Sequence, residues 1–116
     1  MPVQLSKPQI RLIQTINACE IQSDSGKKKC DKLYILSKSH LYLASFDDTS
    51  SALSKDILAG KEISLVFKDK KESLICKGKA TIITKDDEDF EDASDFLAVD
   101  AGKIDHVVEF CVESVG

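Results

Sequence analysis

The sequence predicts a single α+β domain built on an antiparallel β-barrel. Strand-like stretches dominate the chain, short turn-forming segments typical of hairpins join most of them, and helical patterns occur only in the connections. The predicted order is helix, three strands, helix, two strands, helix and strand. A parallel Rossmann-type sheet would instead alternate strands with helices. The 116 residues suit one domain with one modest core.

Composition limits the classes of function. Charged residues make up 31% and hydrophobic residues 42%, as in ordinary globular proteins. No apolar run approaches the roughly 18–20 residues that span a bilayer, and the first residues carry no signal-peptide core. We therefore expect a cytoplasmic protein without a membrane partner. An excess of acidic residues, with a net charge of −4, argues against nucleic acid as the main partner.

The charge is unevenly distributed. Residues 1–79 carry 14 Lys or Arg against 9 Asp or Glu, whereas residues 80–116 carry 2 against 11. Two halves of opposite sign are consistent with two unlike faces, or with subunits that pack positive against negative.

The N-terminal third contains a helix and three strands. Ser6 with Gln9 three residues later has the pattern of a capping box and predicts a helix over about 7–17. Strands are expected over 18–23, 27–37 and 40–46, with turn chemistry at 24–26 and a two-residue hairpin at Lys38-Ser39. In the third strand, side chains should alternate between two faces, with Leu41 and Leu43 on one and Tyr42, Ala44 and Phe46 on the other.

The middle of the chain, His40–Phe67, predicts a strand, a polar loop, a helix and a second strand. The helix should begin near Ser50 or Ser51 and end at Gly60, with a buried stripe formed by Leu53, Ile57 and Leu58. A strand is expected over 62–68.

The C-terminal third predicts two strands around an acidic helix. A strand is expected over 73–84, where Gly78 indicates a bulge or bend. Residues 86–95 hold seven carboxylates and apolar residues at helical spacing, which indicates an amphipathic helix with a solvated face. The spacing does not match an EF-hand loop, so we predict no metal site there. The last strand is expected over 104–115.

The cysteines and histidines do not form a recognisable catalytic or metal-binding motif. None of the four cysteines stands in a C-x-x-C pair, and each lies in or beside an apolar strand, which favours reduced and mostly buried thiols. We expect an exposed side chain at His40 and a surface pair of His106 with Asp105. Catalytic residues are left unassigned, because spacing alone gives no nucleophile–base arrangement.

The polar loop before the middle helix is the candidate ligand site. Backbone N–H groups and the positive end of a helix can hold a phosphate where a strand passes into a helix. The hydroxyls there can equally serve as helix caps and turn formers. The basic run Lys27-Lys28-Lys29 could contact a ligand, or it could simply be the solvated start of a strand.

This element order resembles that of the pyridoxamine 5′-phosphate oxidase-like family, the FMN-binding split barrels. Three segments carry sequence patterns of the family: residues 41–45 correspond to LYFxT, residues 60–67 to NPxVSLxF and residues 78–80 to GxA. Residues 49–58 stand where the family has a polar loop and a short helix. The resemblance implies an antiparallel split barrel of about six strands with two to three short helices, which forms a homodimer with FMN at the subunit interface.

The resemblance also implies a set of cofactor-binding residues. The FMN phosphate would lie near the strand-end hydroxyl of Ser45, with further hydroxyls and two lysines as contacts: Thr49, Ser50, Ser51, Lys55 and Lys28. The family's basic helix residue falls here near Leu53 or Ser54, and neither of these is basic. Lys55 is the nearest substitute on the helix, and Lys28 could supply the charge from a neighbouring strand. Asp47 and Asp48 would repel a phosphate unless they point elsewhere, and the C-terminal extension of the true oxidases is absent.

Two functions follow from the resemblance. The first is a small FMN-binding flavoprotein, either an oxidoreductase of unknown small-molecule substrate or an electron-transfer protein. The second is a non-catalytic dimeric split-barrel protein for binding or regulation that has lost flavin, which the missing basic residue favours. Haem binding on the same scaffold is a third alternative, for which His40 and His106 give little support.

Overall fold

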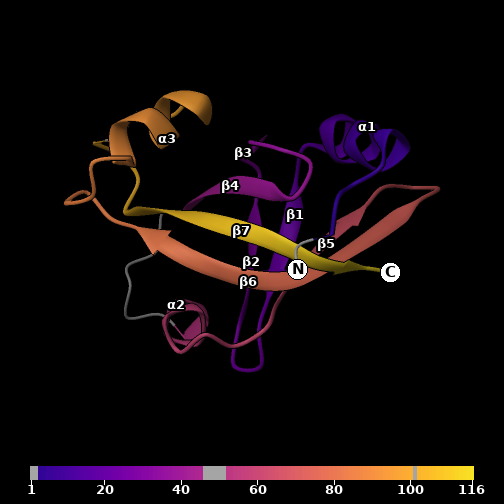
Figure 1. The fold of residues 1–116 in the computed structure, drawn as a ribbon, viewed down its shortest axis with the longest axis horizontal. Coiled ribbons are helices and arrows are strands. Elements are labelled where there is room, and N and C mark those ends of the chain that lie inside the picture. Colours follow the sequence, from indigo (N-terminus) through magenta and orange to yellow (C-terminus); the bar gives the residue numbers. More distant parts are fainter. Residues whose placement is uncertain (1–2, 46–51, 101) are drawn as a thin grey trace.

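The computed structural model describes residues 3–45, 52–100 and 102–116, which form one curled sheet with three helices (Figure 1). The predicted α+β class is confirmed. The elements are α1 (Lys7–Ile16), β1 (Cys19–Gln22), β2 (Lys27–Cys30), β3 (Leu33–Ile35), β4 (His40–Ser45), α2 (Ala52–Leu58), β5 (Ile63–Lys68), β6 (Ser73–Ile83), α3 (Phe90–Phe96) and β7 (His106–Val115).

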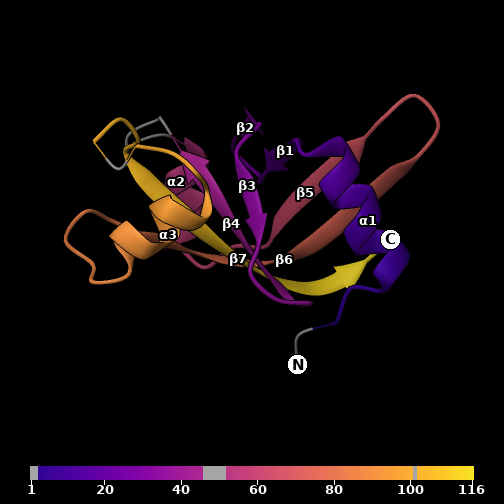
Figure 2. The same cartoon turned by 90° about the horizontal axis from the view of Figure 1, so that it is seen from above.

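The described strands form one antiparallel sheet in the order β2-β1-β5-β6-β7-β4-β3. β2 and β3 follow one another in the chain but stand at opposite edges of the sheet, so the sheet must curl to bring its edges together (Figure 2). At this seam the Ala44 N–H donates to the Lys32 carbonyl oxygen at 3.0 Å. The result is a curled half-barrel, consistent with the predicted antiparallel split barrel, with seven described strands rather than about six.

The connection between β2 and β3 corrects the prediction of one continuous strand over 27–37. The strand is interrupted at Asp31-Lys32, because β2 pairs with β1 whereas β3 pairs with β4. The predicted two-residue hairpin at Lys38-Ser39 is also wrong. Residues 36–39 connect the two strands, and the N–H groups of Leu36 and Ser37 both donate to the His40 carbonyl oxygen.

β6 and β7 form the longest strand pair, and Gly78 lies at its irregularity. The register shifts between Lys77 and Gly78, as the interior glycine predicted. A Cβ atom added at Gly78 would lie 1.9 Å from the backbone oxygen of Cys111, which no side chain can tolerate. The close approach of the two strands therefore requires glycine at this position.

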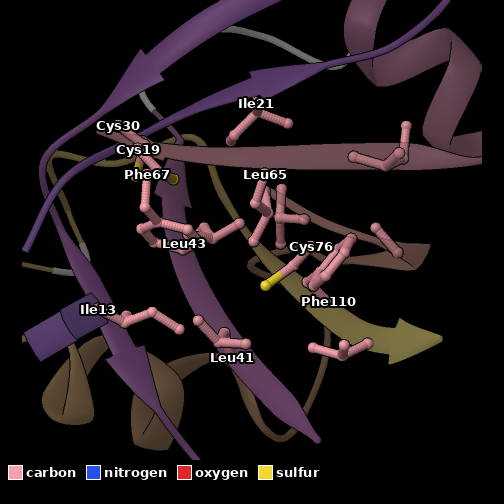
Figure 3. Close-up of a cluster of buried hydrophobic side chains, with 14 of the residues drawn as sticks. Ile13, Cys19, Ile21, Cys30, Leu41, Leu43, Leu65, Phe67, Cys76 and Phe110 are labelled. Atoms are coloured by element: carbon pink, nitrogen blue, oxygen red, sulfur yellow. The ribbon is translucent and has the colours of Figure 1, made fainter. Parts of the chain in front are cut away.

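The larger core cluster lies against the concave face of the sheet, with α1 packed on it. Figure 3 shows its side chains converging from several strands, with Ile13 of α1 among them. The predicted alternation in β4 is confirmed, since Leu41 and Leu43 belong to this cluster. Its fully buried members include Ile63, Leu65, Phe67, Cys76, Phe110 and Val112.

A second, smaller cluster lies on the opposite face of β4 and β7, beneath α3. Tyr42 and Ala44 supply its β4 side, and Phe90, Ala93 and Leu97 supply its helical side. α3 begins at Phe90, so the acidic residues before it form a turn rather than the predicted first helical turn. Phe96 is 48% exposed and stacks on Tyr34 with ring centroids 5.0 Å apart.

The ends of the other two helices follow the predicted signals. α1 has the predicted capping box: the Gln9 N–H donates to the Ser6 hydroxyl, and the Ser6 N–H donates to the Gln9 side chain. Gly60 follows α2 with φ of +74°, the left-handed conformation expected at a helix end. The predicted helix starts at Ser50 and Ser51 lie outside the described residues.

The predicted apolar stripe of α2 is partly wrong. Ile57 is buried, but Leu58 is 65% exposed, and Ser54 and Asp56 are buried instead. The reason is that α2 packs against the polar β1–β2 turn, which needs hydrogen-bonding partners. Of the helices in residues 3–45, 52–100 and 102–116, none is long and apolar enough to span a membrane.

Candidate functional site

The structure places three of the six predicted cofactor-binding residues on separate elements. Ser45 ends β4 opposite His106 of β7, Lys55 is exposed on α2, and Lys28 is exposed on β2. The other three, Thr49, Ser50 and Ser51, lie outside the described residues, as do Asp47 and Asp48.

The turn between β1 and β2 brings β2 next to α2 (Figure 1). A Cβ atom added at Gly26 would lie 3.2 Å from the Leu53 backbone nitrogen and 3.5 Å from the Ala52 side chain. The basic start of β2, which contains Lys28, therefore lies beside the first residues of the helix.

Asp56 holds this contact together. Its carboxylate accepts hydrogen bonds from the Ser25 N–H at 2.9 Å and the Ser25 hydroxyl at 3.4 Å, and it lies 3.5 Å from the Lys61 ammonium group. The hydrogen bond from the Ser23 hydroxyl is the largest of the effects that lower the pKa of Asp56 below its ordinary value, and the Ser25 N–H is the next. Sequence reasoning missed this role, because no local pattern pairs a helical Asp with a turn about thirty residues earlier.

The donor chemistry of this region fits an FMN phosphate in part. Lysine ammonium groups can bind phosphate oxygens, and the region offers Lys55 on α2 and Lys28 on β2. Leu53 and the buried Ser54 occupy the helix positions where the resemblance expects a basic residue. The Asp56 carboxylate is already bound by Ser25 and Lys61, so its charge is compensated within the fold.

A separate cleft of about 640 Å³ opens between the end of α1, β1, β2 and β5. This volume lies within the range of small-molecule sites. Its charged lining is balanced, with Glu20 and Asp31 against Lys29 and Lys68. None of the predicted cofactor-binding residues that the structure describes lines it, so the cleft and the predicted phosphate site are distinct.

Two cysteines line this cleft from neighbouring strands. Cys19 and Cys30 are direct partners in the β1–β2 register, and each is 7% exposed. The Cys30 thiol lies 3.2 Å from the Lys32 carbonyl oxygen and 3.6 Å from that of Ala44, which places it at the seam. Sequence reasoning missed the pairing, because the two positions face one another only once the register of the hairpin is known.

All four cysteines are free, as predicted. Cys76 is fully buried, and burial raises the pKa of its thiol to about 11. Cys111 on β7 is half-buried. Within the described residues, no three His, Cys, Asp or Glu side chains are grouped so that they could hold a metal ion.

The histidines differ from the prediction in their exposure. His106 is 1% exposed, so the predicted surface pair is wrong in its location, although His106 Nδ1 does lie 2.8 Å from Asp105 Oδ2. By the alternation of side chains along β7, His106 shares the face of Val108 and Phe110, which belong to the larger cluster, and it is therefore buried on that face. His40 is half-exposed, and its Nδ1 lies 2.8 Å from the Ser39 hydroxyl.

Comparison with known proteins identifies the fold. No protein-family model matches the chain, and no curated protein sequence matches it. Solved structures do. A protein of Lactobacillus delbrueckii provisionally named as a pyridoxamine 5′-phosphate oxidase has a TM-score of 0.79 at 18% identity, over 97% of this chain and 93% of its own.

Two further solved structures are similar over nearly the whole chain. HupZ of Group A Streptococcus has a TM-score of 0.75 at 17% identity, over 96% of this chain and 91% of its own. A Bacteroides thetaiotaomicron protein provisionally named for 5-nitroimidazole antibiotic resistance has a TM-score of 0.74 at 13% identity, over 99% and 84%. The chain therefore has the split-barrel fold of pyridoxamine 5′-phosphate oxidase-like proteins, as its sequence pattern predicted.

Proposed function

We propose that the chain is a small homodimeric split-barrel flavoprotein that binds FMN and uses it for electron transfer or for oxidoreduction of a small molecule. The observation that carries the proposal is the fold, which matches that of a protein provisionally named as a pyridoxamine 5′-phosphate oxidase over almost the whole chain. The flavin would supply the redox chemistry, and the protein would supply phosphate binding and the surroundings of the ring.

The packing of the β1–β2 turn on α2 supports a phosphate site between the two elements. Gly26 allows the turn to approach Leu53 and Ala52 closely, so Lys28 and Lys55 come from adjacent elements. Two lysines on neighbouring elements can replace the single basic helix residue that the resemblance expects and that is absent here.

The visible absorption spectrum of the purified protein, recorded before and after FMN is added, tests the proposal. We expect flavin bands in the protein as purified, or uptake of added FMN. Lys55→Ala should weaken FMN binding more than Lys28→Ala does, whereas the reverse ranking would move the phosphate to the basic strand. A colourless protein that leaves FMN unbound at tens of micromolar, a weak affinity for a cofactor, contradicts the proposal.

Light scattering tests the assembly separately. A homodimer is expected, because the cofactor site of the proposal lies between two subunits. A monomer at all concentrations would contradict both the dimer and the shared site.

One observation favours a second function, that of a dimeric binding or regulatory protein without flavin. The buried charged side chain of α2 is a carboxylate, Asp56, and the helix carries Leu53 and Ser54 where a phosphate-binding residue is expected. The same spectrum distinguishes the two functions, since this protein would form the dimer and ignore FMN.

A further inference from the structure

We infer that Cys19 and Cys30 form a redox-active dithiol, in which hydroperoxides oxidise Cys30 and Cys19 then closes an intramolecular disulfide. The site does not depend on flavin, and it lies in the cleft at the seam rather than at the predicted phosphate site.

The geometry of the pair permits the bond. Cys19 and Cys30 stand directly opposite one another at the open end of the β1–β2 hairpin, far from its turn. Opposed residues of antiparallel strands have Cα atoms roughly 4.5–5.5 Å apart, within the roughly 4.4–6.8 Å that disulfides span. Figure 3 shows the two side chains next to one another at the edge of the core cluster, beside Phe67.

The surroundings of the two thiols make them unequal. A hydrogen bond from the Cys19 thiol lowers the pKa of Cys30, and this effect outweighs the opposing effect of burial. The same hydrogen bond, together with burial, raises the pKa of Cys19. Cys30 lies on the edge strand β2, whereas Cys19 lies on β1 between β2 and β5, so we assign Cys30 as the attacking group and Cys19 as the resolving one. The lowered pKa of Cys30 acts in the same direction, because thiolate is the reactive form of cysteine.

The position of the two cysteines in the cleft allows a hydroperoxide to reach them. Both residues line the 640 Å³ cleft and retain 7% exposure, whereas Cys76 is fully buried. Among the described strands β2 pairs with β1 alone, at the edge of the sheet, and edge elements open locally at a smaller cost than the core. A hydroperoxide is small enough to reach a thiol that is exposed to this extent.

With hydrogen peroxide as the hydroperoxide, the reaction consumes one molecule of it. The Cys30 thiolate attacks one peroxide oxygen, the O–O bond breaks, and hydroxide leaves with a proton as water, giving the sulfenic acid of Cys30. Without the neighbouring anion, Cys19 loses its proton more readily and attacks Cys30 Sγ. The S–S bond forms, the S–O bond breaks, and a second water leaves. Two thiols are oxidised and one peroxide is reduced to two waters.

Hydrogen peroxide added to the reduced full-length protein tests the inference. After quenching with dimedone and N-ethylmaleimide, peptide mass spectrometry should find a Cys19–Cys30 crosslink and two alkylated thiols, Cys76 and Cys111. The melting temperature of the oxidised protein should rise by several degrees, because the bond closes a loop within the unfolded chain.

Three variants separate the roles. Cys19→Ser should accumulate a dimedone adduct on Cys30, because no resolving thiol remains. In Cys30→Ser, oxidation of Cys19 should be about tenfold or more slower than in the wild-type protein, because the thiol that reacts first with peroxide is missing. Cys111→Ser is the matched control and should form the crosslink at the wild-type rate. Circular dichroism establishes that each variant is folded.

Cys111 provides the sharpest contrast, because it is more exposed than either member of the pair. If exposure alone governed oxidation, Cys111 would react first. Preferential oxidation of Cys111, an intermolecular disulfide, or four thiols that survive peroxide in the wild-type protein would each overturn the inference. These outcomes are read from the wild-type chain, so they hold even if a variant fails to fold.

Discussion

The β6–β7 pair at the centre of the sheet and the β1–β2 pair at its edge are built for different purposes. β6 and β7 are 11 and 10 residues long, and the buried side chains of β7 include Val108, Phe110 and Val112. β1 and β2 have 4 residues each, and β2 exposes three lysines before its single buried cysteine. We therefore expect stability to be concentrated in the centre, while the edge carries the charged and nucleophilic groups that could act on a ligand.

The strongest test of this difference is Gly78→Val in the central pair. The new side chain would meet the Cys111 backbone oxygen, so β6 and β7 would have to separate. We expect a loss of more than about 5 kcal/mol in the free energy of unfolding, or no folded protein. Urea denaturation measures it. Gly102→Ala is the control, because a Cβ atom added there would lie no closer than 3.4 Å to another atom, a side-chain oxygen of Asp100. Equal losses of stability in the two variants would contradict the requirement for glycine at position 78.

Phe110→Ala should have the next largest effect. Phe110 is fully buried in the larger cluster, so its removal leaves a cavity and costs about 3–5 kcal/mol. Phe96→Ala is the matched control, since this ring is 48% exposed on α3 and stacks on Tyr34. Thermal and urea unfolding of both variants should show a much smaller loss for Phe96→Ala. A reversed ranking would contradict the role of Phe110 in the larger core cluster.

Asp56→Asn tests whether Asp56 stabilises the contact between the β1–β2 turn and α2. The pKa of Asp56 is lowered in the folded protein, so its ionised form contributes stability at neutral pH, which is lost as the pH falls through the folded-state pKa. We expect Asp56→Asn to lower the melting temperature at pH 7 by a few degrees and to reduce its dependence on pH between about 5 and 2.

The matched control for Asp56→Asn lies on a distant turn. Asp69 also has a lowered pKa, but the hydrogen bonds responsible come from the N–H groups of Lys71 and Glu72 in its own turn. Asp69→Asn should therefore leave the protease sensitivity of the β1–β2 turn unchanged, whereas Asp56→Asn should increase it. Equal protease sensitivity in the two variants would show that Asp56 does not stabilise the β1–β2 turn.

Ser6→Ala should have the smallest effect. It removes the hydroxyl that accepts the Gln9 N–H, so α1 loses half of its capping box at a cost of about 1 kcal/mol. Lys7→Ala, at the next position, is the control and should change stability by less than about 0.5 kcal/mol. Urea midpoints of the two variants give the comparison, and a larger loss at Lys7 would contradict the cap.

The sequence was informative where a local rule fixes the outcome. The capping box at Ser6 and Gln9, the glycine after α2 and the bulge at Gly78 all depend on backbone chemistry that one or two residues determine. Alternating side chains in β4 predicted which residues enter the larger core, because a strand between two packed faces has a period of two.

Features that depend on tertiary pairing could not be predicted in this way. The break at Asp31-Lys32 exists because neighbouring segments pair with different strands, and Asp56 is buried because a distant turn supplies its hydrogen bonds. The opposition of Cys19 to Cys30 likewise requires the register of the hairpin. Of the candidate phosphate site, the structure locates Ser45, Lys55 and Lys28, and their joint role remains a prediction for the FMN experiment.

The short connection between β2 and β3 also limits how far the barrel can open. From Cys30 to Leu33 the chain advances three residues, which span at most about 11 Å when fully extended. The two edges of the sheet are therefore tethered by covalent bonds at this point, and their separation is set by chain length rather than by hydrogen bonds alone. Residues inserted between Asp31 and Lys32 would lengthen the tether and allow the curvature of the sheet to relax while every strand pairing is retained.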